Sequence, residues 1–216
     1  MVSTSGSSGI PDPMTRFGLP RKLRLLGGGA TRHHRENATV SYSLYQSSVP
    51  GFIAMLTNVS NWLDKAAAQQ DEAMLLEARL APDMFALPRQ IQIASDSAKG
   101  AAAKLTGTEA PAMPDTEASF AELKERCAQT IAYLKGIDPA AYDTGANREV
   151  VMNFPNGGGM RFDGTTYLSG FVMPNFYFHA SMVYAILRAQ GVEIGKFDFL
   201  AHMAPHAFPP PSAPAT

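Results

Sequence analysis

Apolar residues recur at helical spacing along four long stretches of the chain. In residues 44–69 they fall three or four positions apart, which places them on one face of a helix. The apolar positions of this first stretch are Phe52, Met55, Leu56, Val59, Trp62, Leu63 and Ala66. The second stretch covers residues 82–105, and Pro88 within it predicts either a kink or the true beginning of that helix. Residues 115–135 and 165–190 are the third and fourth.

The ends of the third and fourth stretches carry residues typical of helix boundaries. Asp115 and Thr116 are candidate N-caps of the third helix, and Gly136 is placed to end it. Pro174 predicts a break or kink in the fourth helix. Gly191 follows its last apolar position and is expected to end it.

Residues 149–163 depart from helical spacing and have strand character. Apolar and β-branched residues at 149–154 and 160–162 flank a run of Pro, Asn and Gly at 155–159, which is turn chemistry. We predict a small β-hairpin inserted before the last long helix. Together with four amphipathic helices, this predicts an all-α protein built as a four-helix bundle.

The two ends of the chain differ from this middle part. The predicted domain covers residues 40–203, and residues 204–216 form a Pro/Ala-rich tail that we expect to be disordered. Residues 1–39 are predicted to be a disordered basic leader, with six Lys or Arg against two acidic residues. Three interpretations of the leader stay open: an unstructured or mis-started segment, an artificial linker, or an organelle transit peptide.

Composition excludes several classes of function. The net charge is -1 and no basic stripe follows the folded part, so we expect no nucleic-acid partner. No run reaches the roughly 18 apolar residues of a membrane span, so we expect no membrane partner. The chain has one cysteine, Cys127, which fits a reducing compartment. We therefore expect a cytoplasmic protein, or an imported one if the leader is a transit peptide.

Six short motifs carry a resemblance to a known family. They are SVP at 48–50, LAPDMF at 80–85, RQIQI at 89–93, AKGA at 98–101, PNFYFH at 174–179 and GKFDFL at 195–200. Over residues 42–200 the chain resembles the DinB/YfiT-like superfamily of helical bundles. Within that superfamily it is most similar to a branch known only as a domain of unknown function.

This resemblance implies an up-down-down-up bundle that is often dimeric, so we expect a homodimer. It also implies the divalent-metal site of the wider superfamily, which uses one histidine on the second helix and two on the last. The latter two stand one turn apart, because residues i and i+4 share a helix face and both rings can then reach one ion.

The sequence lacks most of these ligands. His179 can take one position, but Val183 follows it by four residues and Asn175 precedes it by four. The second helix offers Gln92 and Asp96 in place of a histidine. We therefore expect no cofactor, and the weak candidates for a divalent metal are His179 and Asp96.

Five residues are candidates for a pocket between the second and last helices: Arg89, Gln92, Asp96, Asn175 and His179. His179 is either a hydrogen-bonded core residue or a ligand-binding or acid/base group, since its ring titrates near neutrality. Asp96 either pairs with the lysine three residues further on, on a solvated face, or turns inward and pairs with His179. Both interpretations stay open for each residue.

These features predict a binding protein rather than a particular reaction. Its expected partner is a small molecule or a second copy of the chain, around a degenerate metal site. The alternative is a metal-dependent or metal-independent transferase or hydrolase acting on a small, thiol-like substrate. That alternative rests on likeness of fold, which supports an activity only weakly.

Overall fold

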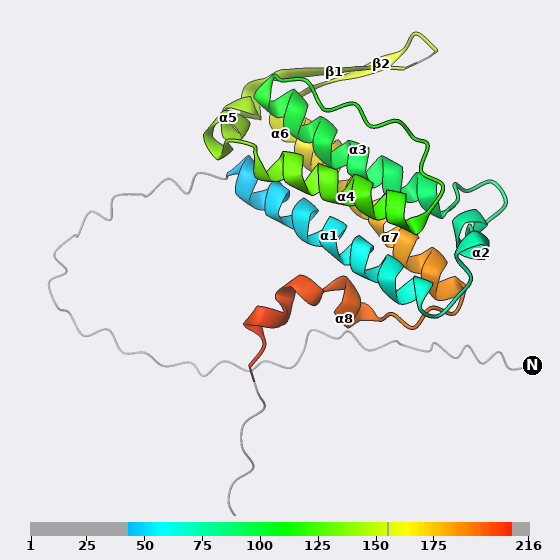
Figure 1. Cartoon of the computed structure of the whole chain (residues 1–216). Helices are drawn as coiled ribbons and strands as arrows, with labels where there is room; N and C mark the ends of the chain where they lie inside the picture. Colours follow the sequence, from blue (N-terminus) through cyan, green and yellow to red (C-terminus); the bar gives the residue numbers. More distant parts are fainter. Residues whose placement is uncertain (1–42, 155, 209–216) are drawn as a thin grey trace, which may run out of the picture. The chain divides into compact units, whose positions relative to one another are not determined.

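A computed structural model describes residues 43–154 and 156–208 (Figure 1). The predicted leader at 1–39 lies outside the described residues, as does the end of the predicted tail at 209–216. The described part is a helical bundle of four long helices, α1 (Leu44–Ala67), α3 (Leu87–Thr106), α4 (Phe120–Lys135) and α7 (Met173–Ala189). A two-stranded hairpin precedes the last long helix. The predicted fold class is confirmed.

The helices run up, down, down and up. Phe52 packs on Phe176 and Trp62 on Tyr184, so α1 and α7 are parallel. Helix α3 runs against α7 (Figure 1). Helix α4 starts beside the end of α1, because the backbone N–H of Phe120 donates to Glu72 at 2.6 Å. The short α2 (Glu72–Glu77) thereby joins the end of α1 to the start of α4.

Because α3 and α4 are parallel, residues 107–119 must cross back along the bundle. Gly107 ends α3 with a φ of 73°, a left-handed conformation that glycine adopts without strain. The crossover then runs against α3: Lys99 Nζ donates to the carbonyl of Pro111 at 3.2 Å, and Gln92 Nε2 donates to Glu117 at 2.9 Å. The crossover thus covers one face of α3.

Two helix starts differ from the sequence prediction. Helix α3 begins at Leu87 rather than near residue 82, which confirms the interpretation that Pro88 marks the true beginning of this helix. Pro88 fits the first turn, because its missing N–H costs no bond there. Helix α4 begins at Phe120, and its N-cap is Ser119, whose hydroxyl accepts from the N–H of Glu122 at 3.2 Å. The predicted caps Asp115 and Thr116 lie in the crossover instead.

The hairpin consists of β1 (Glu149–Asn153) and β2 (Gly159–Asp163), paired antiparallel with Val151 opposite Arg161. The short helices α5 (Pro139–Asp143) and η1 (Thr144–Asn147) precede it. A continuous helical path then leads from α6 (Gly164–Thr166) through a π-helical turn, η2 (Tyr167–Val172), into α7. The predicted irregularity near Pro174 is this π-helical turn, which ends one residue before α7 begins.

After α7 the chain folds back onto α1. Its last described elements are α8 (Lys196–Phe199) and the 3-10 helix η3 (Ala201–His206). Helix η3 therefore continues three residues into the segment that was predicted to be a tail. The Trp62 ring stacks on Phe199, and its Nε1 donates to the carbonyl of Asp198 at 3.2 Å.

The core lies between the four long helices and includes Cys127, which is fully buried. Burial raises the pKa of the Cys127 thiol to about 12, which keeps it protonated and unreactive. No helix among the described residues is both long enough and apolar enough to cross a bilayer.

Candidate functional site

The imidazole of His179 joins α7 to α3. Gln90 Nε2 donates to the carbonyl of Phe85 at 3.0 Å, so its Oε1 is left to accept. His179 Nδ1 lies 2.7 Å from this Oε1 and is therefore the protonated nitrogen of the ring. A chain of hydrogen bonds thus runs from α7 through α3 to the loop that precedes it.

The surroundings of His179 favour its neutral form. The residue is 8% exposed. Burial lowers the pKa of His179 below its usual value, and the positive charge of Arg89 lowers it further. The neutral ring of His179 donates through Nδ1 and so bridges α7 and α3. Its Nε2 lone pair is the one atom of the ring that can accept a hydrogen bond.

Asn175 makes a second bridge between the same helices, one turn earlier on α7. Its Nδ2 donates to the Ser97 hydroxyl at 2.7 Å, and Ser97 in turn donates to the carbonyl of Ile93 at 2.7 Å. Since Gln90 and Ser97 stand seven residues apart, they share one face of α3, and Asn175 and His179 both bind that face.

Asp96 lies on a different face of α3, toward α4 and the crossover. Its carboxylate is 3.0 Å from Lys99 Nζ and 2.7 Å from Arg126 Nη2. The pairing of Asp96 with His179 that we considered is therefore not formed, because two cations hold the carboxylate and Gln90 holds the ring. The solvated-face interpretation with Lys99 describes Asp96 better, although Arg126 was not part of it.

Gln92 and Arg89 also bind the crossover. Gln92 Nε2 donates to Glu117, and its Oε1 accepts from Arg89 at 3.3 Å. Arg89 in addition forms an ion pair with Asp115. Of the five sequence-predicted pocket residues, Asn175 and His179 therefore lie on the α7 side of α3, and the other three lie on the crossover side.

Arg126 is the residue that the sequence analysis missed. Its side chain is 1% exposed and pairs with Asp96, with Asp115 at 3.0 Å and with Glu117 at 2.8 Å. Its position gave one signal, since it lies three residues after Leu123 and four before Thr130, both buried. A buried guanidinium needs carboxylate partners, and the acids of the crossover supply them.

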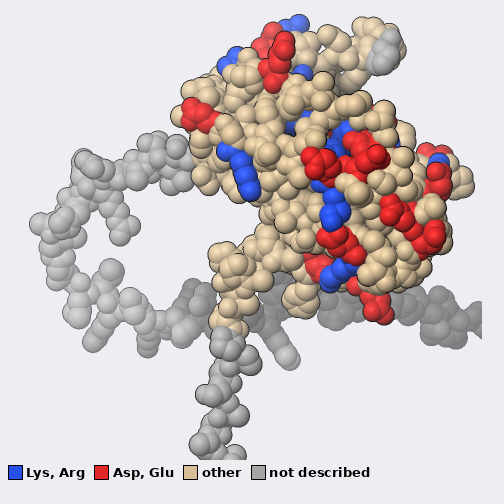
Figure 2. Space-filling model, viewed as in Figure 1, with Lys and Arg blue, Asp and Glu red and all other residues tan. Residues whose placement is uncertain are grey.

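The pKa of Glu117 reflects this pairing. Burial by itself would raise the pKa of the Glu117 carboxyl, but hydrogen bonds from Arg126 and Gln92 outweigh burial and lower it. Acidic and basic side chains gather over α3 and α4 in Figure 2. We infer that this charged cluster fastens the crossover to the bundle.

The residues present do not fit a three-histidine metal site. Within 43–154 and 156–208, no three His, Cys, Asp or Glu side chains lie close enough to hold one ion. His179 is bound to an amide, Val183 has no donor, and Asp96 faces the crossover. A divalent ion at the α3–α7 contact would meet one nitrogen ligand, fewer than zinc or nickel sites use.

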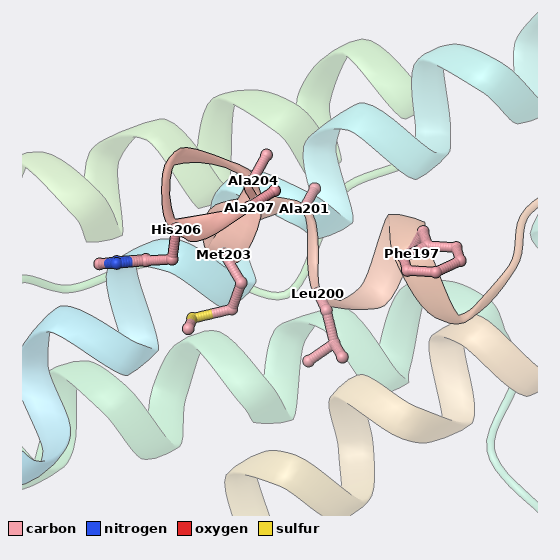
Figure 3. A pocket seen from close by; sticks show the side chains of 7 residues that line it. All are labelled: Phe197, Leu200, Ala201, Met203, Ala204, His206 and Ala207. Carbon is pink, nitrogen blue, oxygen red and sulfur yellow. The ribbon is translucent and has the colours of Figure 1, made fainter. Parts of the chain in front are cut away.

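A second candidate surface lies on the C-terminal elements. The α8–η3 face, as we call it, consists of the outward-facing residues of the α8–η3 segment: Phe197, Leu200, Ala201, Met203, Ala204, His206 and Ala207. They line a hollow of about 460 Å³ (Figure 3). Phe197 is 89% exposed, which is unusual for an aromatic ring outside an interface.

Comparisons with known proteins agree with this geometry. A model of the family described as "Domain of unknown function (DUF1993)" matches residues 44–200. The chain is similar to the crystal structure of a DinB family member protein from Shewanella denitrificans, with 38% sequence identity and a TM-score of 0.67. That match covers 79% of this chain and 96% of the other. No curated protein matches the chain.

Proposed function

Since the chain belongs to the DUF1993 family and has a DinB-like fold, and since that family's description gives no activity, we propose a function from the site itself. The protein is a binding protein that works without a metal and associates with a second copy of itself. The single cysteine fits the cytoplasm as its compartment.

One observation carries the first part of this proposal. The polar groups at the superfamily's metal position are engaged in bonds that hold the bundle together. His179 is bound by Gln90, Asn175 by Ser97 and Asp96 by Arg126. A reaction needs a base, nucleophile or metal that is free to meet its substrate, and these groups serve the fold instead.

The experiment compares the purified full chain with His179→Ala in thermal unfolding, with and without Zn²⁺, Ni²⁺ and Mn²⁺. The variant leaves Gln90 Oε1 without its donor inside the bundle, so we expect a loss of about 1–3 kcal/mol in unfolding free energy. We expect the same response to added metal in both proteins. Lys104, which is exposed near the end of α3, supplies the control, and Lys104→Ala should change stability by less than about 0.5 kcal/mol.

Elemental analysis decides the outcome. Stoichiometric metal in the native protein that disappears in His179→Ala, with the helical spectrum unchanged, would overturn the proposal. It would favour the metal-dependent transferase or hydrolase instead.

A further inference from the structure

We propose that the α8–η3 face is the surface through which two copies of this chain associate about a two-fold axis. In this arrangement Phe197 of each copy lies against the hollow of the other. The inference rests on the proposed self-association and names the surface that performs it.

The face is apolar along its whole length. Phe197, Leu200 and Met203 line it, and Phe208 follows at its end, 87% exposed. Leu200 and Met203 point to the same side of the segment in Figure 3. Large exposed apolar side chains that gather on one short segment mark an interaction surface, whereas single ones scattered over a protein do not.

The charges around the face favour an identical partner. Residues 197–208 contain one charged side chain, Asp198, and it is turned toward Lys65 and the N–H of Gly195. Two copies of a chain bring the same charges to their contact, and like charges brought together cost several kcal/mol. The seven residues of the α8–η3 face bring no Lys, Arg, Asp or Glu to the contact, which avoids this cost. Exposed Lys196 stands at the edge of the face, and this single cation is fewer than the Lys and Arg that interfacial membrane segments carry.

The shape of the face fits a two-fold contact. In such a contact the same patch meets itself, so it must hold both a projecting group and a place to receive one. Phe197 projects almost completely into solvent, and the hollow of about 460 Å³ lies beside it on the same elements. One patch thus contains both parts.

The face is held in place before any partner arrives. Buried Asn58 donates to the carbonyl of Phe199 at 2.9 Å, and Trp62 donates to that of Asp198. Lys65 pairs with the Asp198 carboxylate. Three residues of α1 therefore fix the segment, which lowers the entropy that association must overcome.

The extent of the face predicts a weak dimer. A stable interface commonly uses about 20–30 residues on each side, more than the α8–η3 segment offers. A neighbouring hollow of about 320 Å³, lined by Ser181, Tyr184, Lys196, Phe199 and Leu200, extends the surface onto α7. We expect a dissociation constant in the range of about 1–100 μM, near the weak end of specific complexes.

Sedimentation of the full chain over a range of concentrations tests the proposal. Phe197→Ser and Met203→Ser should each raise the dimer dissociation constant by about tenfold or more, as buried central contacts do. Met160→Ser is the matched control: Met160 is 44% exposed on β2, and Met203 is 47% exposed. The control should leave the dissociation constant within about twofold. Circular dichroism verifies that each variant is folded.

Three other results would overturn the inference in distinguishable ways. A dimer that both face variants leave intact, or that Met160→Ser dissociates, keeps the proposed self-association but places the interface elsewhere. A native chain that stays monomeric at several hundred micromolar removes self-association as well. If the native chain is a monomer that binds the dye anilinonaphthalene sulfonate, and the Phe197→Ser variant does not bind the dye, the face is a small-molecule site instead.

Discussion

The guanidinium of Arg126 connects three segments: α3, the crossover at 107–119 and α4. Its environment could not be read from the sequence, because an arginine in an amphipathic helix normally extends to solvent. Only the parallel arrangement of α3 and α4 brings Asp115 and Glu117 over it. Sequence spacing does locate the stripe on α3, but the partners of that stripe come from 12–30 residues further along the chain.

Glu117 makes this cluster sensitive to acid. Its pKa is lowered in the folded chain, so the unfolded chain takes up the proton first as the pH falls. The stabilisation that ionised Glu117 contributes is therefore complete above its unfolded pKa of 4.5. It is lost as the pH falls below 4.5 and through the lower pKa of the folded chain. Urea unfolding at pH 3–6 should show a flatter acid decline for Glu117→Gln than for the native chain.

Glu125 provides the control for this measurement, since it lies exposed on α4, one residue before Arg126. Glu125→Gln should follow the native profile. Identical acid profiles for the native chain and Glu117→Gln would show that Glu117 does not fasten the crossover.

At the scale of elements, the sequence predicts which helices exist better than where they begin. The ends of α1, α4 and α7 fall within about two residues of their predicted positions, because glycine and the end of the apolar stripe mark them. The N-cap of α4 was placed three or four residues too early, at Asp115 or Thr116 instead of Ser119. Asp115 is a good cap by residue type, but Arg126 holds its carboxylate as an ion pair.

Ser119 should be the residue that stabilises the start of α4. Ser119→Ala removes the acceptor for the Glu122 N–H and should lower the unfolding free energy by about 1 kcal/mol. Thr116 is one of the two residues that the sequence predicted as a cap, and it is exposed. Thr116→Ala should change the unfolding free energy by less than about 0.5 kcal/mol. Chemical denaturation measures both. An equal loss in the two variants would contradict the observed cap.

For the whole molecule, the C-terminal segment packs on the bundle through a few residues of α1. The sequence analysis included this segment in the predicted domain at 40–203. It could not show that buried Asn58 and Trp62 are its binding site, because both also suit the interior of a helix pair. Contacts between residues more than 130 positions apart leave no local pattern.

Trp62 is the only tryptophan of the chain and reports on this contact. Asp198→Ala removes the ion pair with Lys65 and the bond to the Gly195 N–H. We expect the segment to detach more often, which exposes the indole and shifts its fluorescence to longer wavelength. The far-UV circular dichroism of the four long helices should stay nearly constant. Unchanged fluorescence would show that the Trp62 contacts alone hold the segment.

The burial of Cys127 has a practical consequence. Since its thiol is enclosed and protonated, the native protein offers maleimide reagents no reactive group. A cysteine introduced at Gly158, in the exposed turn of the hairpin, would then take a spin label at one position per chain without removal of the native residue. Two labels in one assembly would give a single interspin distance for a two-fold pair, and an ensemble of distances for an irregular aggregate.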